Sequence, residues 1–189
     1  SQIVDLTGIQ DFVALETLSC NGGSLWSSTT GGDGNLKTLD ISKNTKLITL
    51  NCNLNKLNNL DVSSNSLLKN LDCRGNILTS LDVSKNLALN SLSCALNKLT
   101  SLDVTENTSL TSLICHNNQI TSLNVSKNTN LTTIECFSNK LTNLDVSQNV
   151  SLITLNCNSN QLNTLDVSKN VALTTLSCNL NQLTSLDVS

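Results

Sequence analysis

A period of 21 residues runs through almost the whole of this 189-residue chain. One series that keeps this period is acidic at every position but one and consists of Asp40, Asp61, Asp82, Asp103, Asn124, Asp145, Asp166 and Asp187. A second series consists of Cys20, Cys52, Cys73, Cys94, Cys115, Cys136, Cys157 and Cys178. The one irregular step, from Cys20 to Cys52, is 32 residues long, which is one period plus an 11-residue insertion. A short unit repeated without slippage predicts a stack of equivalent coils.

Each repeat contains two similar halves. The first half reads L-x-x-L-x-C-x-x-N, as at residues 47–55, and the second reads L-x-x-L-D-V-S-x-N, as at residues 57–65. The first half alternates with the period of a β-strand, so that Leu50 and Cys52 point to one side and the residues between them to the other. One coil cannot bury enough apolar surface to be stable alone. We therefore expect the coils to stack about 4.8 Å apart and to share hydrogen bonds.

An asparagine closes each half of the repeat, and both asparagine series keep the period of 21. A tight corner leaves backbone N–H and C=O groups without partners, and a primary amide can both donate to and accept from them. We expect this role for both series, one running from Asn44 to Asn170. The other is Asn55, Asn76, Asn97, Asn118, Asn139, Asn160 and Asn181.

These two motifs resemble the leucine-rich repeat family. More narrowly, they resemble the 21-residue cysteine-containing repeats of bacterial surface proteins, such as internalin-type proteins and secreted proteins of Bacteroidetes. Residues 3–9 also resemble the segment that precedes the first repeat in such proteins. The resemblance covers nearly the whole chain and departs from it at the insertion. It implies a right-handed, β-rich solenoid of about eight coils, with a parallel concave sheet and little helix.

The eight cysteines are expected to form a ladder of buried thiols rather than disulfides. Neighbouring cysteines in register point their Cβ atoms in parallel, whereas a disulfide needs them turned toward each other. A metal site is the less favoured alternative, because one sulfur per coil in a straight line cannot build a tetrahedron. A cation-binding role for the aspartate series is likewise less favoured than hydrogen bonding within the D-V-S turns.

Composition argues against several function classes. The net charge is −3, from 11 basic and 14 acidic residues, with no cluster of arginine and lysine that would suit nucleic acid. No apolar run reaches the roughly 18–20 residues of a membrane span. An acyl-transfer triad could use only His116, and Asp72 and Glu135 would lie about 14 Å apart across three coils. We therefore expect no enzyme activity, no cofactor and no metal ion.

The outward columns of the expected sheet are small and polar except near the middle of the chain. There they collect the only arginine and the only histidine, one of the two phenylalanines, an isoleucine and a glutamate. An aromatic ring beside charged and hydrogen-bonding neighbours is typical of a binding surface. The candidate ligand-binding residues are Arg74, Ile114, His116, Glu135 and Phe137. The alternative is neutral variation on a tolerant surface.

The insertion, residues 23–34, carries the only tryptophan, Trp26. Trp26 is a further candidate ligand-binding residue, since it could stack on a sugar or fill a pocket of a partner. The alternatives are that Leu25 and Trp26 cover the first coil, or that the loop holds no fixed position.

We expect residues 1–14 to form a partial N-terminal cap, through Ile3, Leu6, Ile9, Phe12, Val13 and Leu15, and residues 15–189 to form the repeats. Leu183, Leu186 and Val188 would stand at an open face, which suggests either a monomer or a weak end-to-end dimer through uncapped termini. The resemblance implies a non-catalytic module of a secreted or cell-surface bacterial protein, binding protein or glycan through its concave face. The alternative is a structural spacer or stalk with no ligand of its own.

Overall fold

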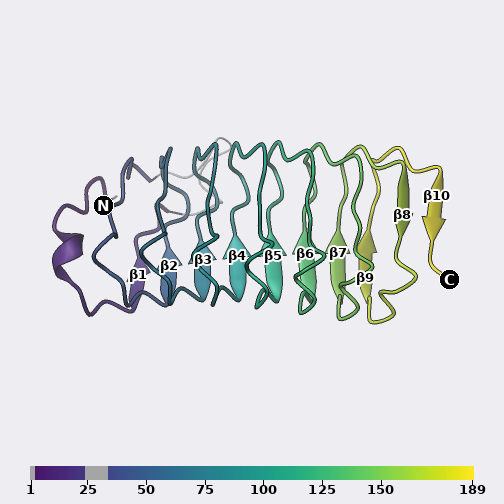
Figure 1. Cartoon of the computed structure of the whole chain (residues 1–189). Coiled ribbons are helices and arrows are strands. Elements are labelled where there is room, and N and C mark those ends of the chain that lie inside the picture. The colour runs from purple at the N-terminus through teal and green to yellow at the C-terminus, as the bar shows by residue number, and fades with distance from the viewer. Residues whose placement is uncertain (1–2, 24–33) are drawn as a thin grey trace.

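The chain forms a solenoid of stacked coils in a computed structural model that describes residues 3–23 and 34–189 (Figure 1). Eight short strands pair in parallel in the order β1-β2-β3-β4-β5-β6-β7-β9, and seven complete turns join them. The strands are β1 (Thr17–Ser19), β2 (Thr49–Asn51), β3 (Asn70–Asp72), β4 (Ser91–Ser93), β5 (Ser112–Ile114), β6 (Thr133–Glu135), β7 (Thr154–Asn156) and β9 (Thr175–Ser177). From β2 onward, each residue pairs with the one 21 positions later, which confirms the predicted repeat.

Helix is almost absent from the described residues, as predicted. The only helical element there is the 3-10 helix η1 (Ile9–Asp11). No helix within residues 3–23 and 34–189 has the length and apolar character needed to cross a bilayer. A second sheet, which the sequence analysis did not predict, pairs β8 (Thr164–Asp166) with β10 (Ser185–Asp187) in the D-V-S half of the last coils.

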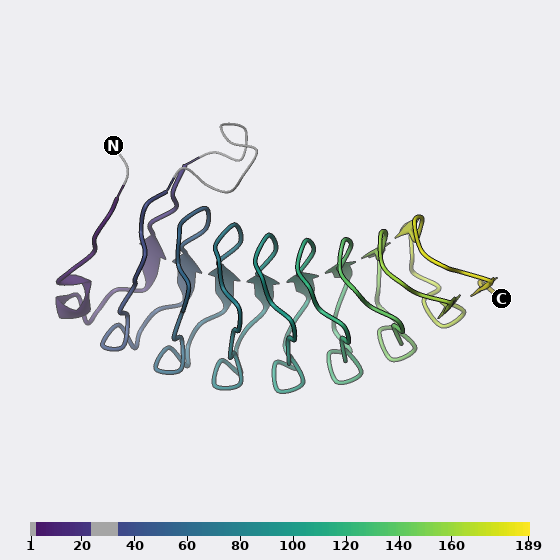
Figure 2. The same cartoon turned by 90° about the horizontal axis from the view of Figure 1, so that it is seen from above.

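The stack is gently curved, and the eight-stranded sheet lies on the inner side of the curve (Figure 2). The core is a set of straight columns, because equivalent residues of successive coils lie in register. Within one coil, Leu47, Leu50 and Cys52 come from the sheet half, while Leu57 and Val62 come from the D-V-S half, and all five are fully buried. The two halves thus close on one shared apolar interior.

The asparagine series beginning at Asn55 links successive coils by hydrogen bonds. Asn76 donates through Nδ2 to the carbonyls of Cys73 in its own coil and Cys52 in the preceding one, at 2.9 and 3.1 Å. Its Oδ1 accepts the N–H of Leu57 at 3.0 Å. Both ends of the amide are used, as the sequence predicts.

The series beginning at Asn44 works differently from the prediction. Asn86 donates through Nδ2 to Val62 O and Asn65 O, at 3.0 and 2.9 Å. Its Oδ1 is buried and accepts no hydrogen bond from the described residues, and the same holds for every member of the series. The expectation that both asparagine series donate and accept is therefore wrong for the series that begins at Asn44. At this corner the amide contacts backbone carbonyls, so it donates and does not accept.

The cysteines form the predicted ladder. All eight are free thiols; seven are buried, and Cys178 in the last coil is half-buried. Burial raises the pKa of the Cys20 thiol to about 11, and those of Cys115 and Cys157 to about 12. Cys73 points its thiol at the carbonyl of Ser93 in the next coil, with 3.6 Å between sulfur and oxygen.

The N-terminal segment lies against the first coil. Asn44 donates to Ile9 O and Phe12 O, both at 2.9 Å, so residues 9–12 supply the carbonyls that a preceding coil would supply elsewhere. Leu6, Ile9 and Leu15 pack against the core. Ile3, Phe12 and Val13 are exposed, so these three of the predicted capping residues do not cover it.

The insertion leaves and rejoins the coil at one point. Gly22 donates its N–H to Asn53 O at 2.9 Å, and Gly34 donates to Leu54 O at 3.1 Å. A Cβ at Gly22 would lie 1.9 Å from Leu54 O, and one at Gly34 would lie 2.3 Å from Asn55 Oδ1. Only glycine fits at these two stems. Trp26, like the rest of residues 24–33, lies outside the described residues.

Candidate functional site

The sheet presents three columns of side chains on the inner side of the solenoid, with one residue of each column in each coil from β2 to β9. We call these columns the sheet face. They are Thr49, Asn70, Ser91, Ser112, Thr133, Thr154 and Thr175; Asn51, Asp72, Ser93, Ile114, Glu135, Asn156 and Ser177; and Asn53, Arg74, Ala95, His116, Phe137, Asn158 and Asn179. Most are small and uncharged, so the exceptions stand out.

The exceptions form what we call the central patch: Arg74, Ile114, His116, Glu135 and Phe137. All five are half-buried. Each coil supplies its members by strict alternation, because the residues between them point into the core. In the coil of β6, for example, the buried Cys136 separates Glu135 from Phe137, and both therefore face outward.

His116 and Phe137 stack on each other across two neighbouring coils. Their ring centroids lie 4.1 Å apart, and the ring planes differ by 11°. The sequence predicts this adjacency, because the two residues are 21 positions apart. The stack is the one aromatic pair among the described residues.

The protonation of His116 follows from its surroundings. Nδ1 of its ring lies 3.0 Å from Nδ2 of Asn117, which is within hydrogen-bond distance. Burial, followed by the positive charge of Arg74, lowers the pKa of His116 below its ordinary value. His116 is therefore uncharged at neutral pH.

Arg74 is anchored by its neighbour on the same strand end. Its Nε lies 3.4 Å from Oδ2 of Asp72, and its backbone N–H donates to Oδ1 of Asp72 at 3.2 Å. Asn53 of the preceding coil donates to the same Asp72 Oδ2 at 2.7 Å. Ala95, which lies between Arg74 and His116 in the third column, is completely covered. Nothing in the repeat pattern indicates the anchoring role of Asp72 and Asn53.

Glu135 differs from the other charged groups of the sheet face. Its carboxylate forms no ion pair and accepts no hydrogen bond from the residues that the structure describes. Ile114 lies beside it in the same column, since the two are register partners of β5 and β6. The central patch therefore combines a paired cation, a neutral aromatic stack, an aliphatic side chain and an unpaired carboxylate.

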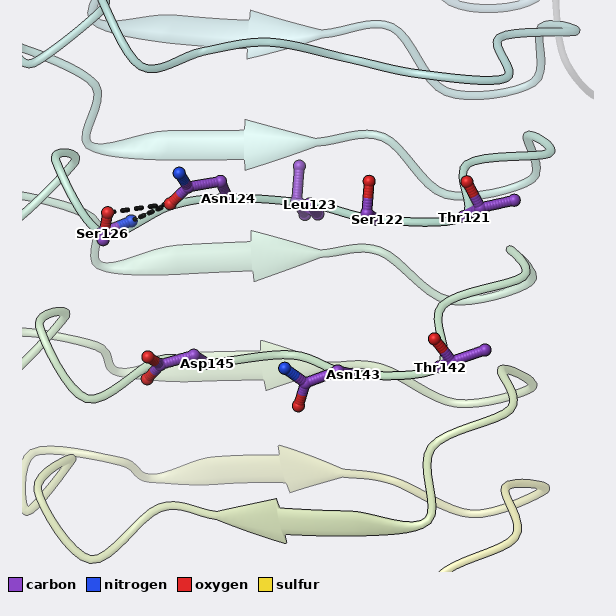
Figure 3. Close-up of a pocket in the computed structure, with 8 residues that line it drawn as sticks. All are labelled: Thr121, Ser122, Leu123, Asn124, Ser126, Thr142, Asn143 and Asp145. Atoms are coloured by element: carbon purple, nitrogen blue, oxygen red, sulfur yellow. Dashed lines mark hydrogen bonds between the residues drawn. The ribbon is translucent and has the colours of Figure 1, made fainter.

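A shallow pocket of about 260 Å³ lies on the D-V-S half rather than on the sheet face (Figure 3). It is lined by Thr121, Ser122, Leu123, Asn124, Ser126, Thr142, Asn143 and Asp145. The Oδ1 of Asn124 already accepts hydrogen bonds from the N–H and hydroxyl of Ser126, at 3.1 and 2.8 Å. A pocket with small polar walls, no aromatic ring and the Oδ1 of Asn124 already occupied offers little for recognition.

The aspartates of the D-V-S turns are occupied in the same way. Asp82, for example, accepts the N–H of Ser84 at 2.8 Å, and this hydrogen bond and that of the Ser84 side chain lower the pKa of Asp82. Across residues 3–23 and 34–189, no group of three or more histidines, cysteines and carboxylates is placed to hold a metal ion.

Comparisons with known proteins connect this geometry to a class. No protein-family model and no curated protein sequence matches the chain. Among solved structures, the functional domain of InlJ from Listeria monocytogenes, which includes a cysteine ladder, is 47% identical with a TM-score of 0.92. That match covers 100% of this chain and 40% of the InlJ chain.

Two further solved structures show the same fold at lower identity. Internalin InlF from Listeria monocytogenes is 23% identical with a TM-score of 0.81, and the match covers 100% of this chain and 58% of the InlF chain. A leucine-rich repeat protein of Leptospira interrogans is 21% identical with a TM-score of 0.77, over 95% of this chain and 50% of that one. The chain is a leucine-rich repeat solenoid. Within that class it is of the cysteine-containing, internalin-like type that the resemblance predicts.

Proposed function

We propose that this chain is a non-catalytic module that binds a protein partner through the central patch of its sheet face. The observation that carries the proposal is the His116–Phe137 stack, flanked by the Arg74–Asp72 pair and by Glu135, on a face that is otherwise small and uncharged. Aromatic residues, phenylalanine included, and arginine are enriched at protein interfaces. Leucine-rich repeat neighbours, including one solved as the LRIM1/APL1C complex, support a role in protein interaction.

The chemistry of the patch favours binding over catalysis. His116 is the chain's only histidine, and its Nδ1 is bound to an amide rather than to a carboxylate that could orient it as a base. Cys115 and Cys136 lie next to the patch in sequence, but both are buried and their pKa values are raised, so neither can serve as a thiolate nucleophile.

The setting that we propose is the surface or the exterior of a bacterium. The likeness to internalins supports this. Since the chain spans 40% of the InlJ chain, the activity of any larger protein that contains it belongs to the proposal as well.

A second candidate function, a spacer that projects another domain, is favoured by one observation. Beyond the central patch, the columns of the sheet face are nearly uniform from coil to coil. A spacer needs no partner, so its central patch should be replaceable at no cost to any interaction.

An array of purified proteins and glycans, probed with this chain, tests these alternatives. We expect protein partners whose binding falls at least tenfold in the double variant His116→Ala/Phe137→Ala, as for hot-spot residues. The matched control is Asn179→Ala, which truncates a side chain of the same column near the far end of the sheet and should change binding less than twofold. Glycan partners alone, or a double variant that binds like the wild type, would contradict the proposal.

A further inference from the structure

The charges of the sheet face do not balance within it. Asp72, Arg74 and Glu135 are its charged residues, and Asp72 and Arg74 neutralise each other at 3.4 Å. Asp72 also accepts hydrogen bonds from Asn53 and from the backbone of Arg74, which fixes the pair in place. The carboxylate of Glu135 is left without a partner among the described residues. Its complement is therefore a positive charge that a ligand must bring.

Phe137 adds a surface that suits such a charge. One face of its ring is covered by His116, and the side chain is partly exposed on the sheet face, where its neighbour in the next coil is Asn158. Glu135 and Phe137 flank the buried Cys136 and project to the same side of the same coil. Guanidinium groups stack on aromatic faces and pair with carboxylates, and here one coil offers both.

His116 does not oppose a bound cation at neutral pH. Its ring is uncharged, because burial and the neighbouring Arg74 lower its pKa. It stacks on one face of the Phe137 ring, and Phe137 remains partly exposed. The net charge of −3 over the whole chain also attracts a basic partner rather than an acidic one.

We propose that Glu135 and Phe137 form a subsite that takes a basic side chain, arginine above all, from the protein partner. This inference rests on the proposed function and names the chemistry of the partner at that site. Arg74 would be the anchor for a competing, acidic ligand, but its charge already has a counter-ion in Asp72, whose Oδ2 lies 3.4 Å from Nε. The unpaired group of the sheet face is the carboxylate.

The probe for this subsite is the blocked tripeptide acetyl-Gly-Arg-Gly-amide, compared with acetyl-Gly-citrulline-Gly-amide, which has nearly the same shape but no charge. The ring signals of His116 and Phe137 report binding in an NMR titration, since the chain has one histidine and two phenylalanines. We expect saturable shifts with the arginine peptide and at least about fivefold weaker binding of the citrulline peptide.

Three variants make the test specific. Glu135→Gln should weaken binding of the arginine peptide about fivefold, to the affinity of the citrulline peptide. Phe137→Leu should weaken binding of the arginine peptide about threefold. Glu106→Gln is the matched control, because it removes the same charge from an exposed residue outside the sheet face that pairs with Lys127 at 3.5 Å. It should change binding less than twofold. Unaltered thermal melting would show that each variant is folded.

Equal binding of the two peptides would overturn the subsite, and so would wild-type affinity in Glu135→Gln. Tighter binding of acetyl-Gly-Glu-Gly-amide, with shifts at the Arg74 side chain, would also overturn it. The failure of this subsite can be told apart from the failure of the proposed function. If partners from the array depend on His116 and Phe137 while the arginine peptide shows no preference over citrulline, recognition by the central patch stands and only its basic subsite falls.

Discussion

The two halves of each coil share one interior but differ at their surfaces. In the D-V-S half, each turn repeats the same hydrogen bond from serine or threonine to the acidic position, as in Ser63 to Asp61 at 2.9 Å, and the outer surface is monotonous. In the sheet half, the interior is equally regular, but the outward residues change from small amides to Arg74, His116 and Phe137. Regular interiors can carry variable surfaces, because stacking depends only on the inward columns.

The halves also differ in what their interiors hold. The sheet half buries a line of ionisable thiols and an asparagine whose amide is used at both ends. The D-V-S half buries valine, leucine and an asparagine whose Oδ1 has no partner among the described residues. Changes in pH that act on the thiols, and substitutions of the asparagines, should therefore affect the stability of the two halves differently.

The largest effect is expected at alkaline pH and acts on the sheet half alone. Burial raises the pKa of the thiols, to about 11 for Cys20 and about 12 for Cys115 and Cys157. The thiols of the unfolded chain therefore ionise at lower pH than those of the folded chain. The unfolding free energy keeps its full value below about pH 8.5. Above that pH it falls by about 1.4 kcal/mol per pH unit for each thiol. Urea denaturation under reducing conditions at pH 7, 8, 9 and 10 measures this loss.

A single-thiol variant provides the control for the alkaline prediction. Cys94→Ala removes one buried thiol and should lower the slope of stability against pH by about one proton. A slope near zero up to pH 10 in the wild type would contradict the buried ladder.

The two asparagine series provide the next largest contrast. Asn76→Ala leaves the buried N–H of Leu57 without a partner. It also removes one of two amide donors from the carbonyls of Cys52 and Cys73, which still accept from Asn55 and Asn97. The variant should cost about 3 kcal/mol of unfolding free energy. Asn86→Ala removes one hydrogen bond each from the carbonyls of Val62 and Asn65, which still accept the N–H groups of Asn65 and Leu68, so no group loses its last partner. This variant should cost about 2 kcal/mol. Chemical denaturation of both variants at pH 7 tests the order. A greater loss in Asn86→Ala would reverse this account of the two series.

The corner after the cysteine is where the sheet half must turn sharply. Leu54, Leu96 and Asn117 have φ near +55° there, and the equivalent Gly75 has φ +66°. Gly75→Ala would place a Cβ 2.6 Å from Cδ2 of Leu54 and should cost about 1–2 kcal/mol. Leu96→Asn introduces a residue that tolerates this conformation and should gain about 0.5 kcal/mol. Thermal melting compares the two, and a gain in Gly75→Ala would refute the strain.

The insertion should have the smallest effect, because it leaves the sheet half between two stems that already touch. Deleting residues 23–33 joins Gly22 to Gly34 and restores the 21-residue step from Cys20 to Cys52. We expect the unfolding free energy to change by less than about 1 kcal/mol. A loss above about 2 kcal/mol would show that the insertion covers part of the core.

Much of the fold follows from the sequence because one period fixes the register of every coil. Once Leu50 pairs with Leu71, the stack of cysteines and the adjacency of His116 to Phe137 follow without further information. The period does not predict which backbone groups form hydrogen bonds with an asparagine side chain. That depends on the corner geometry, and this is why the unused Oδ1 of Asn86 was not predicted.

Residues outside the repeated pattern were harder to predict. Phe12 and Val13 are apolar but exposed, because the N-terminal segment meets the first coil through Leu6, Ile9 and Leu15 instead. In the central patch, the period placed Arg74 on the sheet face but gave no sign that Asp72 would hold it. A 21-residue repeat predicts which residues of neighbouring coils are adjacent. It does not predict contacts between side chains of the same coil, such as that of Asp72 with Arg74.

The central claim is that recognition takes place on the sheet half of the coils and not on the D-V-S half. Hydrogen–deuterium exchange of the chain, alone and with a protein partner found on the array, tests this claim most directly. We predict slower exchange in β3 to β6 and in the corners that follow them, at residues 70–75 and 133–138 above all. Protection confined to the D-V-S turns, such as residues 82–86 and 145–149, would contradict it.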